Sequence, residues 1–185
     1  RSMILDGRPL RGKELDQLKD FLGSQEVEYD PEAEYTVCLL NDSYEMEAAG
    51  SVCGHVICCV AFGEAGREKY AHTLIARLVQ YQFKKSRSHI LVYTRPEYLE
   101  LFREQGFYLV LNIGKTLLME NRICGLRSEI TEEGMDDMLE EEQKCSILCN
   151  LLIENKKIQE LIPADIRNKL LHTSQKSMYE TRFKE

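Results

Sequence analysis

Apolar residues recur along the chain with two periods, and these periods predict helices and strands in alternation. Apolar residues three to four positions apart predict amphipathic helices over residues 12–21, 67–85 and 96–106. Gly23 follows the first helix, Pro96 stands where the third begins, and Gly106 stands where it ends. The second pattern is the longest, with Leu74 and Leu78 on its apolar face.

Short runs rich in β-branched and aromatic residues predict strands between these helices. They cover residues 34–40, 45–51, 55–62, 89–94, 107–111 and 116–120. The run from His55 to Phe62 is almost continuously apolar, which is typical of a central strand covered on both faces. The order α-β-β-β-α-β-α-β-β over the first 121 residues predicts an α+β fold, in which helices cover both faces of one sheet.

The chain changes character after this segment. Residues 128–144 hold eight acids and one base, which predicts a solvated acidic helix or linker, or else a docking surface for a basic partner. Apolar residues return after Cys145 and predict terminal helices. We therefore expect a domain over residues 3–122, an acidic linker over 123–144 and a helical extension over 145–185, with Arg1-Ser2 as a cloning remnant.

Composition excludes several classes of function. The 185 residues carry a formal charge of -7, which argues against a protein that binds nucleic-acid phosphates. With 43% hydrophobic and 30% charged residues, the chain is too apolar for disorder and too charged for a membrane protein. It also lacks the apolar stretch of a signal peptide, so we expect a cytoplasmic protein.

The seven cysteines support a reduced compartment. They show no C-x-x-C pair, the usual spacing of zinc ligands, so the sequence predicts no metal site. Cys58 and Cys59 are adjacent in a predicted strand, where neighbouring side chains point to opposite faces. We expect free, buried thiols.

The chemically informative segment is the junction between the apolar strand and the long helix, Val60 to Leu74. A strand that leads into a helix N-terminus presents unpaired N–H groups and the positive end of the helix dipole to an anion. This junction and the order of strands resemble the GNAT acetyltransferases, whose pyrophosphate loop reads (R/Q)-x-x-G-x-(G/A). Arg67 stands at its first position, and the segment 101–107 is similar to the family's F-Y-x-x-x-G-F segment. The resemblance implies a mixed, mostly antiparallel sheet.

A more extensive resemblance covers most of the first 122 residues, to the N-terminal GNAT-like domain of the citrate lyase ligases. It rests on four segments in order, residues 50–61, 90–97, 101–107 and 117–121. In that family a nucleotidyltransferase domain with a His-containing ATP motif follows. Here 64 residues follow Asn121, and no H-x-x-H or H-x-G-H occurs, so ATP-dependent ligase activity is not expected of this chain alone.

The resemblance implies a site for acetyl-CoA or CoA. The residues expected to bind it are Val60, Phe62, Arg67, Glu68, Lys69, Tyr70, Ala71 and His72. Tyr70 and His72 stand where the family has Gly or Ala, and Glu68 adds repulsion toward a pyrophosphate, so we expect a weakened cofactor loop.

The catalytic residues are left unassigned. Phe102 occupies the place of the family's proton-donating Tyr, for which Tyr93 or Tyr98 is a substitute or merely a core aromatic. The candidate bases are Glu45, Glu47 and His55, and His72 either binds phosphate or caps the helix. Three interpretations stay open: an acyl-CoA-binding or acetyltransferase domain, a non-catalytic interaction module on a decayed scaffold, or a ligase remnant without adenylylation.

Overall fold

The structure of the protein is a computed structural model that describes residues 3–7, 10–113, 116–123, 125–126 and 156–169. The chain divides into two compact units, residues 1–90 and residues 91–185.

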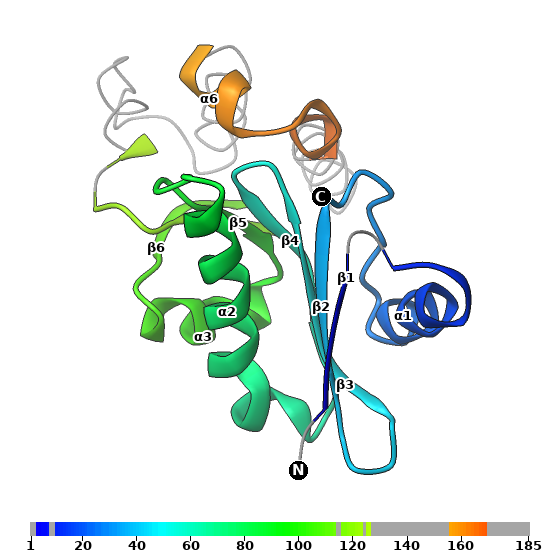
Figure 1. The fold of residues 1–185 in the computed structure, drawn as a ribbon. Coiled ribbons are helices and arrows are strands. Elements are labelled where there is room, and N and C mark those ends of the chain that lie inside the picture. The colour runs from blue at the N-terminus through cyan, green and yellow to red at the C-terminus, as the bar shows by residue number, and fades with distance from the viewer. Residues whose placement is uncertain (1–2, 8–9, 114–115, 124, 127–155, 170–185) are drawn as a thin grey trace, which may run out of the picture. The chain divides into compact units, whose positions relative to one another are not determined.

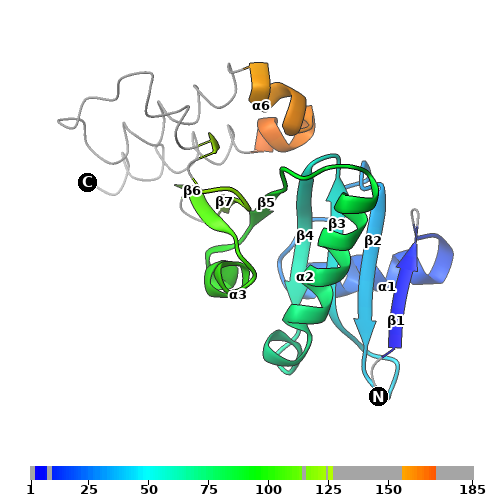
Figure 2. The same cartoon turned by 60° about the vertical axis from the view of Figure 1, so that its left-hand side comes forward.

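The first unit is a four-stranded antiparallel sheet with helices on both faces (Figure 1). Its elements in chain order are β1 (Met3–Gly7), α1 (Gly12–Ser24), β2 (Tyr35–Leu40), β3 (Met46–Cys53), β4 (Val56–Phe62) and α2 (Gly66–Lys84). The strands lie side by side in the order in which they follow in the chain. Figure 2 shows α2 crossing in front of β2, β3 and β4, with α1 behind them.

The sequence analysis missed β1. This strand pairs antiparallel with β2, from Met3 opposite Leu40 to Gly7 opposite Thr36. Five residues at the start of a chain give a short, weakly alternating pattern, so the pairing partner and not the local pattern determines the strand.

The core of this unit lies between the sheet and α2. Leu74, Ile75 and Leu78 of α2 are at most 1% exposed, and every residue of β4 is buried. The rings of Tyr35 on β2 and Tyr81 on α2 stack with their centroids 4.1 Å apart. Burial of every residue of β4 confirms the prediction that this strand is covered on both faces.

A β-bulge interrupts the pairing of β3 with β4. Ala49 lies opposite Ala61 and Ser51 opposite Cys58, so two residues of β4, Cys59 and Val60, oppose the single residue Gly50. Cys59 takes the left-handed conformation with φ 54°, which breaks the alternation of side chains along the strand.

The second unit contains the remaining strands, paired antiparallel in the order β5-β7-β6. Its elements are β5 (Leu91–Thr94), a 3-10 turn (Pro96–Tyr98), α3 (Leu99–Glu104), β6 (Tyr108–Ile113), β7 (Thr116–Glu120), α6 (Lys156–Leu161) and a further helical turn over residues 164–169. Phe102 of α3 is fully buried, and its ring meets that of Phe107 edge-on at 5.7 Å.

The α+β class, the three helices predicted within the first 121 residues and the six predicted strands are confirmed, most within one or two residues of their predicted ends. The helical extension expected over residues 145–185 lies largely outside the described residues and stays a prediction. The acidic segment 128–144 lies entirely within residues 127–155, outside the described residues, and the expected boundaries at residues 122 and 144 stay predictions. Among the described helices, none is long and apolar enough to span a membrane.

Candidate functional site

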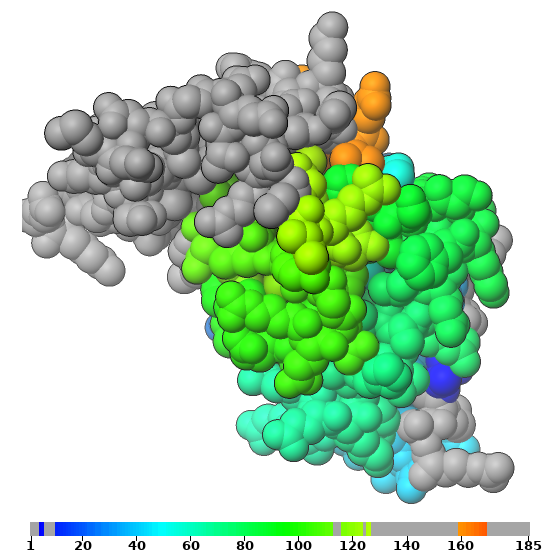
Figure 3. All heavy atoms as spheres, turned by 90° about the vertical axis from the view of Figure 1, so that its left-hand side faces the viewer, coloured from blue at the N-terminus to red at the C-terminus, as the bar shows by residue number. Residues whose placement is uncertain are grey.

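A pocket opens where β4 ends and α2 begins. Its volume is about 460 Å³, and it is lined by Gln25, Phe62, Gly63, Glu64, Ala65, Arg67 and Glu68. In the space-filling view, atoms with the colour of the start of α2 lie on the molecular surface (Figure 3). Most of the lining residues from Glu64 to Glu68 are exposed, so the pocket is open to solvent. It lies at the N-terminus of a helix, where backbone N–H groups lack carbonyl partners within the helix.

Two glycines give the loop its tight path. The Gly63 N–H donates to the Glu47 carbonyl at 2.8 Å, and the Gly66 N–H donates to the Gly63 carbonyl at 3.0 Å. A Cβ built on Gly66 would lie 2.2 Å from the Glu47 carbonyl oxygen, and one on Gly63 would lie 2.8 Å from Glu47 Oε2. The loop thus packs directly on the start of β3. Gly66 has no room for a side chain, because the contact is with the Glu47 backbone, whereas at Gly63 it is with the end of the flexible Glu47 side chain.

The charges around the pocket are mixed. Arg67 supplies one positive side chain to the lining, whereas Glu64 and Glu68 supply two negative ones. Ala65, at the N-cap of α2, makes no side-chain cap hydrogen bond. An anion in the pocket would therefore meet the positive helix end and Arg67, and it would be repelled by two carboxylates.

The structure places the eight predicted site residues in three environments. Phe62, Arg67 and Glu68 line the pocket. Val60, Tyr70 and Ala71 are at most 7% exposed. Lys69 and His72 are exposed, and Lys69 Nζ lies 5.2 Å from the centroid of the Tyr70 ring.

The buried position of Tyr70 bears directly on the expected loop defect. Its side chain is 3% exposed and belongs to the inner face of α2, where it packs as a core residue. A tyrosine in place of the family's glycine therefore does not fill the pocket, whereas Glu68, another departure from the motif, is one of its lining residues.

The sequence analysis missed four lining residues. Gly63, Glu64 and Ala65 belong to the connecting loop, and their signal was the Gly63-x-x-Gly66 spacing directly after β4. Gln25 follows α1 and lies 37 positions before Phe62 in the chain, so no local pattern identifies it.

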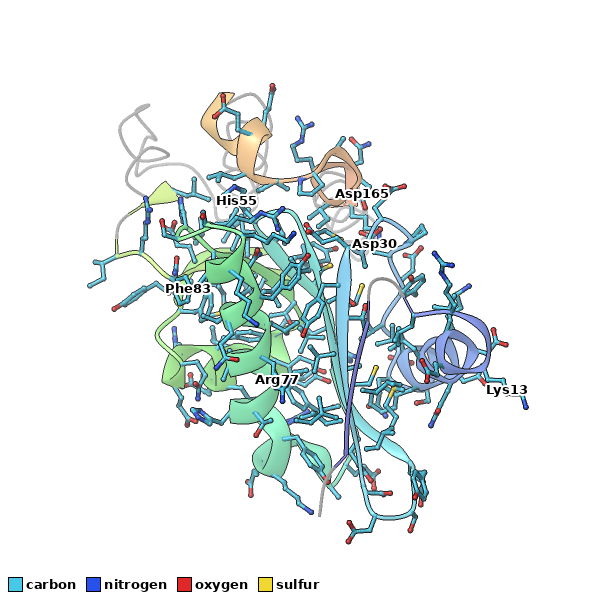
Figure 4. The ribbon with its side chains drawn as sticks, viewed as in Figure 1. Lys13, Asp30, His55, Arg77, Phe83 and Asp165 are labelled. Atoms are coloured by element: carbon cyan, nitrogen blue, oxygen red, sulfur yellow. The ribbon has the colours of Figure 1, made fainter. Side chains whose placement is uncertain are left out.

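Among the candidate bases, Glu47 lies nearest to this loop. Its Oε1 accepts a hydrogen bond from Asn41 Nδ2 at 2.9 Å, and its backbone carbonyl holds Gly63. Glu45 is exposed in the preceding turn, and His55 Nδ1 lies 3.0 Å from the His89 carbonyl. Figure 4 labels His55 at the start of β4, whereas the pocket lies at its opposite end.

The aromatic candidates for a proton donor belong to the second unit. Tyr98 is 2% exposed and Phe102 is fully buried, whereas Tyr93 is half-buried on β5. Phe102 is a core residue whose ring is packed against Phe107.

No protein-family profile matches the chain. It is 33% identical over 119 residues to the [citrate [pro-3S]-lyase] ligase of Haemophilus influenzae, and 31% identical over 117 residues to that of Escherichia coli. These alignments cover 63% and 62% of this chain. The chain spans about a third of the length of both relatives, 36% and 33%.

Two solved structures share the fold. Escherichia coli ElaA matches with a TM-score of 0.56 at 14% identity, over 66% of this chain and 100% of its own. An acyl-CoA N-acyltransferase from Pseudomonas aeruginosa matches with a TM-score of 0.54 at 15% identity, over the same shares. The fold is that of the GNAT acyltransferases. The resemblance to GNAT proteins and to part of citrate lyase ligase is thereby confirmed, whereas the roles of single residues stay predictions.

Proposed function

We propose that the first unit binds the pyrophosphate of an acyl-CoA in the pocket between β4 and α2. The observation that carries the proposal is an open pocket at a helix N-terminus with Arg67 in its lining, in a fold shared with an acyl-CoA N-acyltransferase. The N–H groups of the first turn of α2 and the Arg67 guanidinium would hold the phosphates.

Binding is weaker than a glycine-rich loop would give. Glu64 and Glu68 line the same pocket as Arg67, so the lining carries one net negative charge before a multiply charged pyrophosphate arrives. An exposed charge beside a ligand changes the free energy of binding by only about 1 kcal/mol, because water screens it. We therefore expect binding at high micromolar to millimolar acyl-CoA.

Acyl transfer is the chemistry that this binding would serve. The general base in this proposal is Glu47, since its backbone contacts the pocket loop and its carboxylate accepts a hydrogen bond from Asn41. The buried ring of Phe102 cannot give a proton to a leaving thiolate, so transfer would depend on another donor or on water. A non-catalytic acyl-CoA-binding module is the alternative that this buried phenylalanine favours.

Thermal unfolding with CoA, acetyl-CoA and ATP, each added separately, tests the proposal. A ligand at ten times its dissociation constant stabilises a protein by about 1.4 kcal/mol, which raises the Tm by a few degrees. We expect a shift with both CoA compounds. Equal Tm shifts with ATP and CoA would mean that the pocket binds phosphates in general. No Tm shift with either CoA compound would contradict the proposal.

Two charge reversals on one helix locate the site. Arg67→Glu places a third acid in the pocket and should remove most of the CoA-dependent shift. Lys84→Glu makes the same change in the last turn of α2, and its CoA-dependent shift should equal that of the unmodified protein. Equal loss in both variants would mean that net charge, and not the pocket, governs the response.

A further inference from the structure

Three buried side chains of the first unit converge on one point, away from the pocket between β4 and α2. Asp30 and Cys53 are 2% exposed and Cys58 is 3% exposed. Cys58 Sγ lies 3.4 Å from Cys53 Sγ, which in turn lies 3.7 Å from Asp30 Oδ2. All three ligand atoms lie within 4.8 Å of one another. Figure 4 labels Asp30, in the connection that leads from α1 to β2.

The bulge in β4 brings a third thiol next to this group. Cys59 Sγ lies 3.9 Å from Cys58 Sγ and 3.5 Å from the Glu28 carbonyl oxygen. The expectation that Cys58 and Cys59 point to opposite faces was wrong, because the left-handed conformation of Cys59 breaks the alternation of the strand.

The separations match those of ligands around one tetrahedral ion. Zinc binds sulfur at about 2.3 Å and carboxylate oxygen at about 2.0 Å, which places two sulfurs about 3.8 Å apart and a sulfur and an oxygen about 3.5 Å apart. The observed values are 3.4 Å between the sulfurs of Cys53 and Cys58, and 3.7 Å between Cys53 Sγ and Asp30 Oδ2. Cys58 Sγ and the Asp30 carboxylate lie within 4.8 Å, so a small rearrangement of these three side chains would bring them into coordination.

The buried carboxylate is the second observation that points to a cation. In the described part of the chain, Asp30 Oδ1 accepts the Glu32 N–H at 2.9 Å, and Oδ2 has only the long, weak contact with the Cys53 thiol. A carboxylate removed from water is costly unless a cation or strong donors compensate it. No ion pair with Asp30 occurs among the described residues.

The strand register disfavours a disulfide as the explanation for the close sulfurs. Cys58 lies opposite Ser51, and Cys53 lies opposite Val56, so the two cysteines form a diagonal pair. Diagonal neighbours have Cα atoms about 7–8 Å apart, whereas a disulfide needs about 4.4–6.8 Å. A bridging ion does not require the Cα atoms to approach.

We propose that Asp30, Cys53 and Cys58 form a structural zinc site that fastens the α1–β2 connection to the β3–β4 hairpin. Cys59, whose Sγ lies beside Cys58 Sγ but outside the group of three, would have to move in to become the fourth ligand. The cysteines bind as thiolates and release their protons to solvent. Because its ligands come from residues 30 to 59 without a C-x-x-C pair, spacing in the sequence alone could not show it. The site is independent of acyl-CoA binding.

Metal content of the full chain tests this proposal. The protein is produced in zinc-supplemented medium, purified with a reductant and without chelators, and analysed by elemental mass spectrometry. We expect about one zinc ion per chain, and less than about a tenth of that in Cys58→Ser and Asp30→Asn. Cys38→Ser is the matched control, since Cys38 is a fully buried strand cysteine that has no place in the cluster, and it should retain its zinc.

A second measurement does not depend on the folding of variants. Chelation of the unmodified protein should lower its Tm, and Zn²⁺ but not Mg²⁺ should restore it. Cobalt in place of zinc should give a thiolate-to-cobalt charge-transfer band. A protein that stays free of zinc after reconstitution with Zn²⁺, equal zinc loss in Cys38→Ser, or a linked Cys53–Cys58 peptide from the purified protein would overturn the proposal.

Discussion

Arg87 Nη1 lies 2.9 Å from Glu34 Oε1, and this ion pair joins the end of α2 to the start of β2. The same guanidinium nitrogen donates to the Gly54 carbonyl at 2.9 Å, while the Gly54 N–H donates to Glu34 Oε1 at 2.8 Å. Glu34 Oε2 also accepts the Tyr81 hydroxyl at 2.9 Å. One carboxylate thus holds the turn between β3 and β4 and the C-terminal end of α2.

This carboxylate should make stability depend on pH. Burial raises the pKa of Glu34, but the hydrogen bonds from Tyr81, Arg87 and Gly54 and the charge of Arg87 outweigh it and hold the pKa below its ordinary 4.5. A pKa lower in the folded state gives a contribution that is present above pH 4.5 and lost as the pH falls through the folded value.

Glu34→Gln should therefore lower the free energy of unfolding by about 1–2 kcal/mol at pH 7, a reduced figure because the side chain is partly exposed. Urea titrations of both proteins from pH 3 to pH 7 would measure this. The difference between them should shrink below pH 4.5. A difference that is constant over the whole range would mean that shape and not charge is responsible.

Glu68→Gln should strengthen the binding of CoA. The substitution keeps the size of a side chain in the pocket lining and removes one of its two acids, so it reduces repulsion toward a pyrophosphate. We expect the Kd, measured by calorimetry, to fall by about threefold to fivefold in low salt and less at high ionic strength. Glu104→Gln, an exposed glutamate of the second unit, serves as the control and should leave the Kd unchanged.

Phe102→Tyr restores the tyrosine of the GNAT motif, but the structure predicts a loss of stability from it. Phe102 is fully buried and packs edge-on against Phe107, so the added hydroxyl enters an apolar region. An unpaired buried hydroxyl costs about 1–3 kcal/mol. Chemical denaturation measures this cost. An unchanged stability would mean that the hydroxyl finds a partner, and the variant would then be worth assaying for acetyl transfer.

The sequence predicted those elements whose apolar residues repeat at a regular local spacing. Leu74 and Leu78 repeat at helical spacing, and the apolar run of β4 is long enough to indicate a central strand. Of the eight residues predicted to bind CoA, Phe62, Arg67 and Glu68 line the pocket because they belong to one continuous motif, and their binding of CoA stays a prediction. Gln25 was missed, because it reaches the pocket through tertiary packing from a different element.

The bulge at Cys59 shows most clearly what a local pattern cannot give. A run of buried residues has the same hydrophobicity whether or not one extra residue is inserted, so its period contains no sign of the bulge. Only the pairing of Ser51 with Cys58 and of Ala49 with Ala61 reveals it. This single insertion decides which face of the sheet the Cys59 thiol occupies, and hence whether it lies beside the Cys58 thiol.

The last prediction concerns the turn that shapes the pocket. Gly66→Ala should destabilise the first unit, because the new Cβ would lie 2.2 Å from the Glu47 carbonyl oxygen, a backbone atom that can move only with β3. Overpacking of this kind costs about 1–3 kcal/mol and opposes the gain that alanine normally brings to a helix. Gly23→Ala is the matched control, since Gly23 lies in α1 with no atom within 4 Å of a built Cβ. It should be neutral or stabilising by as much as about 1 kcal/mol. Urea denaturation of the two variants gives the comparison, with CoA titrations alongside. If Gly66→Ala were as stable as Gly23→Ala, the loop would not pack against Glu47, and the geometry on which the pocket depends would be wrong.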